Sequence, residues 1–147
     1  MRSPRCLALL LVLGAAGCLP DHPPAPEELA LEHFAEGETY FAQGRVAEAA
    51  IEYEFAATHR PRWKEAYLKL ARCREIQGRD EDAISALERL LLQDRTDEDG
   101  LRAVATLYAR RGDAERALDR YRRLRALRPE DRSLDGEIAR LEGLRKP

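Results

Sequence analysis

The fold is decided by residues 64–97, KEAYLKLARCREIQGRDEDAISALERLLLQDRTD. Apolar residues recur at a helical period on both sides of Gly78, which separates two amphipathic segments. These apolar positions are Tyr67, Leu70, Ala71, Ala83, Ile84, Leu87, Leu90 and Leu91. Because neither segment can bury its apolar stripe alone, the stretch predicts two helices that pack against each other as a hairpin.

The same pattern recurs along the chain with a period of 34 residues. Its members are Gly44, Gly78 and Gly112, then Ala49, Ala83 and Ala117, and then Tyr53, Leu87 and Tyr121. Glycine ends a helix where the backbone needs a positive φ, and alanine allows two helices to approach closely. The period predicts three hairpins at about residues 30–63, 64–97 and 98–131.

The first unit resembles the tetratricopeptide repeat (TPR), and the other two units resemble it in the same register. The residues that carry the resemblance are Gly37, Tyr40, Gly44, Ala49, Tyr53, Ala56 and Pro61. The departures from the family pattern are His33, Arg74, Leu90, Arg95 and Leu124. The resemblance implies an all-α fold in which residues 28–131 form three TPR-like helix-turn-helix repeats in a short right-handed superhelical array.

A final amphipathic segment follows Pro129. Leu134, Ile138, Leu141 and Leu144 recur there at helical spacing among charged residues. Repeat arrays need terminal elements that cover the open end of the stack. We therefore expect a C-terminal capping helix within residues 132–147.

The N-terminus has the features of an export signal and an anchor. Arg2 and Arg5 precede a short apolar core, which predicts a signal peptide over residues 1–17. Ala15-Ala16-Gly17-Cys18 resembles the bacterial lipobox, which implies a lipoprotein with palmitate-type acylation at Cys18 and membrane attachment through it. The alternative is cleavage at the same bond by an ordinary signal peptidase, which would release a soluble periplasmic protein.

Residues 18–27 are rich in proline and predict an extended tether. Leu19 stands where, in the enterobacterial sorting scheme, an Asp retains lipoproteins in the inner membrane. By resemblance, we expect the periplasmic face of the outer membrane, with inner-membrane anchoring as the alternative.

Composition and motifs argue against several classes of function. The net charge of −2 gives no basic excess, so no nucleic-acid partner is expected. No zinc, phosphate-loop or nucleophile motif occurs, so we expect no metal, no cofactor and no enzyme.

Other residues are expected to have structural roles. Cys73 is expected to be structural, and Thr96 is expected to be the N-cap of the third unit. Acidic residues among arginines at helical spacing predict solvated faces with i,i+4 ion pairs.

In TPR arrays the first helices of successive hairpins line a binding groove. By resemblance, its residues here are Phe34, Glu38, Phe41, Leu68, Arg72, Glu75, Arg102, Thr106 and Arg110. Phe34 and Phe41 share a helix face and are expected to anchor a partner, the alternative being that they pack inside the array. An enzyme with a site in this groove would instead need converging titratable residues.

The expected function is a non-catalytic adaptor or scaffold in the bacterial cell envelope. Its partner is expected to be another envelope protein or a peptide segment, bound while an envelope complex assembles. The alternative is binding of anionic lipid or glycan through the third repeat, because residues 102–128 contain nine arginines. The first repeat is acidic, so head-to-tail self-association is a further expectation.

Overall fold

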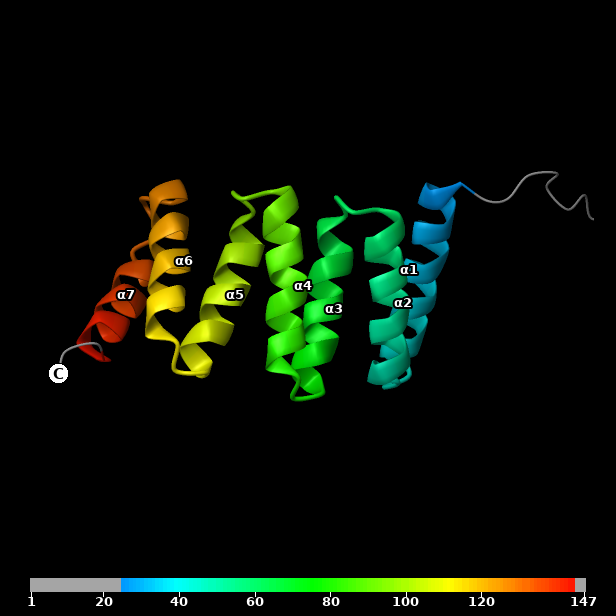
Figure 1. Cartoon of the computed structure of the whole chain (residues 1–147), viewed down its shortest axis with the longest axis horizontal. Coiled ribbons are helices and arrows are strands. Elements are labelled where there is room, and N and C mark those ends of the chain that lie inside the picture. Colours follow the sequence, from blue (N-terminus) through cyan, green and yellow to red (C-terminus); the bar gives the residue numbers. More distant parts are fainter. Residues whose placement is uncertain (1–24, 145–147) are drawn as a thin grey trace, which may run out of the picture.

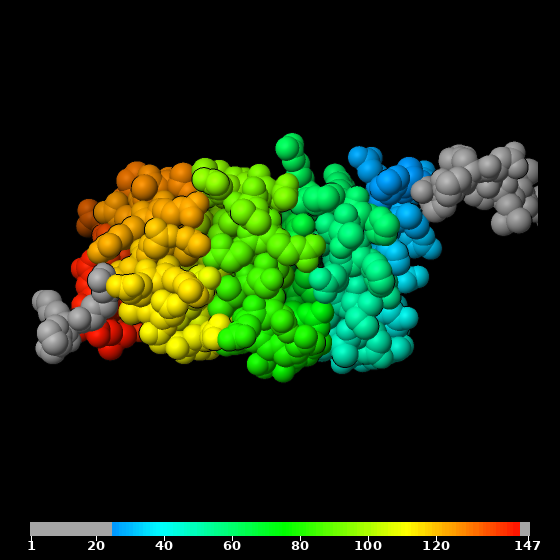
Figure 2. Space-filling view, in the orientation of Figure 1, coloured from blue at the N-terminus to red at the C-terminus, as the bar shows by residue number. Residues whose placement is uncertain are grey.

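The computed structural model describes residues 25–144 and contains seven helices and no strand within that range. The helices are α1 (Pro26–Ala42), α2 (Val46–His59), α3 (Lys64–Ile76), α4 (Asp80–Gln93), α5 (Glu98–Arg110), α6 (Ala114–Leu127) and α7 (Ser133–Leu144). Each helix packs mainly against the next one in the chain, so the helices form a row from α1 to α7 (Figure 1). In the space-filling view, sequence order runs along the long axis of the molecule (Figure 2).

The helices pair into three hairpins, α1–α2, α3–α4 and α5–α6, and α7 packs on α6. This arrangement confirms the expected all-α fold of TPR-like repeats followed by a last helix. Helix α1 begins at Pro26, inside the range expected to be tether. Proline is favoured in the first helical turn because the missing N–H would have no intrahelical acceptor there.

The three periodic glycines end the first helix of each hairpin. Gly44, Gly78 and Gly112 have φ values of 75°, 71° and 81°, which lie in the left-handed region. After Gly78, the Arg79 N–H donates to the Arg74 carbonyl at 2.8 Å, which closes the helix end. The turn therefore depends on a residue without a Cβ, as the sequence indicated.

The core is made of alanine, leucine and tyrosine and runs continuously from α2 to α7. The periodic alanines Ala49, Ala83 and Ala117 are fully buried, so the helices approach closely at these points. A smaller cluster, built around Ala56, Ala66, Tyr67 and Leu90, joins the first two hairpins near Trp63. The array is consequently one packed unit and not three independent hairpins.

The start of α5 differs in detail from the prediction. The N-cap is Asp97 and not Thr96, because Asp97 Oδ1 accepts from the Gly100 N–H at 2.7 Å. Thr96 instead donates its hydroxyl to Asp94 Oδ1 at 2.7 Å. The Lys64 ammonium lies 3.3 Å from Asp97 and 2.6 Å from Asp99, so the beginning of the second hairpin is tied to the beginning of the third.

Most ion pairs in the part of the chain that the structure describes are not the expected i,i+4 pairs. Several pairs within a helix or its cap are at i,i+3, as between Arg140 and Glu137. Most pairs join different helices, for example Arg110 to Asp80 and Arg111 to Glu81. The repeat stack brings these residues together at long sequence distance, which a helical pattern alone does not specify.

None of the helices described here has the length and apolar character of a membrane span.

Candidate protein-binding surface

The residues expected to line a groove lie on the first helices of the hairpins, α1, α3 and α5. We call this surface the odd-helix face and define it by the nine expected residues together with Lys69 and Ile76. Two ion pairs link its helices directly. The Lys69 ammonium lies 2.7 Å from Glu38, which joins α3 to α1, and Arg110 lies 3.3 Å from Glu75, which joins α5 to α3.

Phe34 and Phe41 are both half-buried at the α1 end of this face. The Phe34 ring stacks on Trp63 with a centroid distance of 4.4 Å and meets Tyr53 edge-on at 5.4 Å. The Lys69 ammonium lies 5.8 Å from the centroid of the Phe41 ring. Phe34 therefore completes the core between two hairpins, and Phe41 is partly covered by a charged side chain.

Glu38 is held in place by two donors. Its carboxylate accepts from the Tyr53 hydroxyl at 2.5 Å and from the Lys69 ammonium at 2.7 Å. The hydrogen bond from Lys69, followed by the one from Tyr53, lowers the pKa of Glu38. Glu38 is thus an ionised structural link between α1, α2 and α3, with less capacity to bind a partner than the sequence suggested.

The middle of the face, on α3, carries exposed side chains that are not tied to neighbouring helices. Leu68 is half-buried, whereas Arg72 is exposed and has no ion pair or hydrogen bond to any residue that the structure describes. Ile76, one helical turn further on, is 49% exposed. Ile76 was not among the residues expected from the sequence, although the 34-residue period indicates it, because Arg110 lies one period after it.

The α5 end of the face is bound to its neighbours. Arg102 pairs with Asp131 at 2.7 Å, and the Thr106 hydroxyl lies 3.2 Å from the Tyr121 hydroxyl. Arg110 donates two hydrogen bonds to Asp80, at 3.0 and 2.7 Å, and the bonds to Asp80 raise the pKa of Arg110. These three side chains therefore stabilise the stack.

Cys73 lies on the buried side of α3 and is fully inaccessible. Burial raises the pKa of its thiol to about 11. A thiol in this state is a weak nucleophile, in keeping with the expected structural role.

The arginines of the third hairpin do not form a free basic patch. Apart from Arg123, each arginine from 102 to 128 lies within ion-pair distance of a carboxylate; the pairs are Arg102–Asp131, Arg110–Asp80, Arg111–Glu81, Arg116–Asp113, Arg120–Glu88, Arg122–Glu142, Arg125–Asp135 and Arg128–Glu98. Arg123 donates to the Arg95 carbonyl at 2.8 Å. Internal pairing reduces the attraction that this hairpin would have for anionic lipid or glycan.

Two of the hollows away from the odd-helix face are lined by charged side chains of both signs. One lies between α2, α3 and α4 and is lined by Glu54, Arg74, Arg79, Asp82, Ser85 and Arg89, among others. The other lies between α4 and α6 and is lined by Glu88, Leu91, Leu92, Arg95, Arg120 and Arg123. In the first, Glu54 pairs with both Arg74 and Arg89, at 3.1 and 3.2 Å, so the carboxylate is neutralised.

Comparison with known proteins agrees with this architecture. Residues 40–110 match the family model described as tetratricopeptide repeat. No curated protein sequence matches the chain significantly. Proteins with this repeat commonly act as protein-binding scaffolds, and the fold is typically a non-catalytic interaction domain.

Three solved structures illustrate the similarity. The first TPR of Spaghetti (RPAP3), bound to an HSP90 peptide, is 19% identical with a TM-score of 0.68, covering 80% of this chain and 93% of that chain. MamA protein is 19% identical with a TM-score of 0.70, covering 79% of this chain and 63% of that chain. The Yersinia enterocolitica type III secretion chaperone SycD, in complex with a peptide of the translocator YopD, is 13% identical with a TM-score of 0.62. The match covers 80% of this chain and 89% of the SycD chain.

Proposed function

We propose that the chain is a non-catalytic adaptor that binds a peptide segment of another protein on the odd-helix face. The observation that carries this proposal is the middle of the face, where Arg72 is exposed without a hydrogen bond or ion pair to any described residue and Ile76 exposes 49% of its surface. The similar RPAP3 and SycD domains were both solved with peptides of partner proteins, which supports this mode of binding.

The chemistry of α3 indicates what kind of peptide would bind. A free guanidinium favours a carboxylate, with which it can form two parallel hydrogen bonds. An exposed isoleucine next to it favours an apolar side chain, whose burial contributes about 25 cal/mol per Å². The partner segment is therefore acidic with at least one apolar residue, and it contacts α3.

Replacing Arg72 and Ile76 together by glutamate should abolish capture of the partner. Arg72→Glu reverses the charge that attracts a carboxylate, and Ile76→Glu removes the apolar contact. The measurement is affinity purification of the full chain from crosslinked, detergent-solubilised membranes, with co-purifying proteins identified by mass spectrometry.

The matched control is Leu92→Glu, which places the same charge on an apolar side chain that is 73% exposed but lies outside the odd-helix face. We expect the control to retain the partner at the wild-type level. Equal recovery of the partner with the Arg72→Glu/Ile76→Glu variant would contradict the proposal, as would its loss with Leu92→Glu.

We further propose that this adaptor works in the bacterial cell envelope, anchored by lipidated Cys18 and assisting assembly of an envelope complex. The support is the sequence before α1, namely the charged and apolar leader, the lipobox-like residues 15–18 and the proline-rich tether. The signal peptide, Cys18 and most of the tether lie outside the described residues. Leu19 favours the periplasmic face of the outer membrane.

Cys18→Ser should remove the anchor. A single acyl chain binds membranes only marginally, whereas a lipoprotein cysteine carries two or three chains and is therefore stably anchored. We therefore expect the wild-type chain to incorporate labelled palmitate and to sediment with membranes, and Cys18→Ser to do neither. Cys6→Ser is the control and should behave as wild type. Labelling of Cys18→Ser, or a wild-type chain that is unlabelled, would contradict the anchor.

A further inference from the structure

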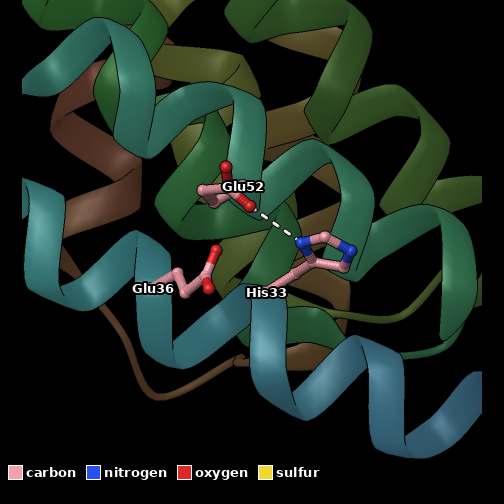
Figure 3. A group of neighbouring side chains, drawn as sticks. All are labelled: His33, Glu36 and Glu52. Carbon is pink, nitrogen blue, oxygen red and sulfur yellow. Dashed lines mark hydrogen bonds and ion pairs between the residues drawn. The ribbon is translucent and has the colours of Figure 1, made fainter. Parts of the chain in front are cut away.

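Three side chains that can bind metal converge on one flank of the first hairpin. His33 and Glu36 come from α1, and Glu52 comes from the facing side of α2 (Figure 3). His33 Nδ1 lies 2.8 Å from Glu52 Oε2, and one ligand atom from each of the three residues lies within 4.8 Å of the others. We propose that His33, Glu36 and Glu52 form a binding site for a divalent transition-metal ion of the zinc class.

The donor set favours zinc over calcium or magnesium. An imidazole nitrogen with carboxylate oxygens suits zinc and its neighbours in the first transition row, whereas calcium and magnesium prefer oxygen ligands throughout. Three protein ligands leave a position for water in a tetrahedral shell. The spacing also fits, because residues i and i+3 of one helix share a face, and helix bundles hold metals with such pairs and a carboxylate from a facing helix.

The charges on this flank favour a cation. Glu36 has no hydrogen bond or ion pair to any residue within the described range, and the partner of Glu52 is His33. Residues 25–58 contain no lysine and a single arginine, Arg45, which pairs with Glu48 at 3.0 Å. Two carboxylates held this close repel each other, and a divalent ion would offset that repulsion.

The imidazole ligand is already positioned for binding. The His33 ring stacks on Phe55 with a centroid distance of 5.0 Å and on His59 at 5.8 Å, which restrains its orientation. His33 and Glu52 are half-buried, whereas Glu36 is exposed, so the site is open to exchange with solvent. A metal bound here would link α1 to α2 and stabilise the hairpin at the end of the stack.

The test is titration of the purified full chain with zinc by calorimetry and with cobalt by visible absorption. His33→Asn, Glu36→Gln and Glu52→Gln should each weaken binding by at least about tenfold, because loss of even an outer-shell partner of a metal site costs that much. Zinc should also raise the melting temperature of the wild-type chain more than that of these variants. Circular dichroism without metal checks that each variant folds.

The matched control is Glu32→Gln, which removes one negative charge from α1 at an exposed position outside the ligand set. It should bind zinc as the wild type does. An equal loss of zinc affinity with Glu32→Gln would mean that zinc binds to a diffuse acidic surface, and it would overturn the proposed site. Unchanged affinity in the three ligand variants, or a cobalt spectrum dominated by thiolate charge transfer from the cysteines, would overturn it too.

Discussion

Gly37→Leu is expected to lower the free energy of unfolding by about 3 kcal/mol or more, because it overpacks the contact between α1 and α2. A Cβ at this position would lie 2.8 Å from Tyr53 Cε1 and 2.9 Å from Tyr53 Cδ1. Tyr53 is fully buried and donates its hydroxyl to Glu38 at 2.5 Å, so the ring has little freedom to move away. Urea denaturation followed by circular dichroism measures the change.

The matched control for this substitution is Gly136→Leu. Gly136 also lies inside a helix, α7, but a Cβ there would meet no atom within 4 Å. Leucine has the higher helix propensity by somewhat less than about 1 kcal/mol, so the control should be neutral or slightly stabilising. A similar loss of stability in both variants would show that the effect is not the contact with Tyr53.

Leu87→Ala is expected to cost about 2–5 kcal/mol, because it leaves a cavity in the middle of the core. Leu87 is fully buried in α4 and belongs to the cluster that runs from α2 to α7. It occupies the repeat position that Tyr53 and Tyr121 fill in the other hairpins. The midpoint of urea denaturation should fall while the transition stays cooperative.

Leu92→Ala in the same helix provides the comparison. Leu92 is 73% exposed, so the same truncation should change stability by no more than about 0.5 kcal/mol. If Leu87→Ala cost less than about 1 kcal/mol, or if both variants were equally destabilised, the register of α4 against its neighbours would be wrong.

The two proposed sites use different sides of the first hairpin and can fail independently. Glu38 of α1 reaches Lys69 of α3 on the odd-helix face, whereas His33 faces Glu52 of α2. Arg72→Glu/Ile76→Glu should therefore leave zinc binding unchanged. Glu52→Gln should leave capture of the partner unchanged, because Glu52 lies outside the odd-helix face.

The sequence by itself determined the architecture of this protein. The 34-residue spacing of Gly44, Gly78 and Gly112 placed each turn, and the apolar stripes on either side placed each helix. The architecture can be predicted from the sequence because the same positions recur in each repeat, so the register is indicated several times. The left-handed turn residue and the helical period are also local properties of the chain. The buried positions Ala49, Ala83 and Ala117 could be identified for the same reason.

Tertiary structure alone decided which surface residues are available. The sequence left open whether Phe34 anchors a partner or packs inside the array, and Trp63, from the loop before α3, stacks on its ring. The arginines of the third hairpin looked like a basic patch, but most of their carboxylate partners come from distant parts of the chain, as Arg120 pairs with Glu88. Nothing local in the sequence specifies such pairs.

The candidate metal site also depends on tertiary structure and not on a local sequence pattern. No metal was expected from the sequence, because it contains no known metal-binding motif, and His33 and Glu52 are 19 residues apart. The hairpin brings them to 2.8 Å, and Glu36 joins them because it lies one turn from His33. Helix positions follow from local periodicity, whereas the meeting of side chains follows from how the helices pack, and only the fold decides that.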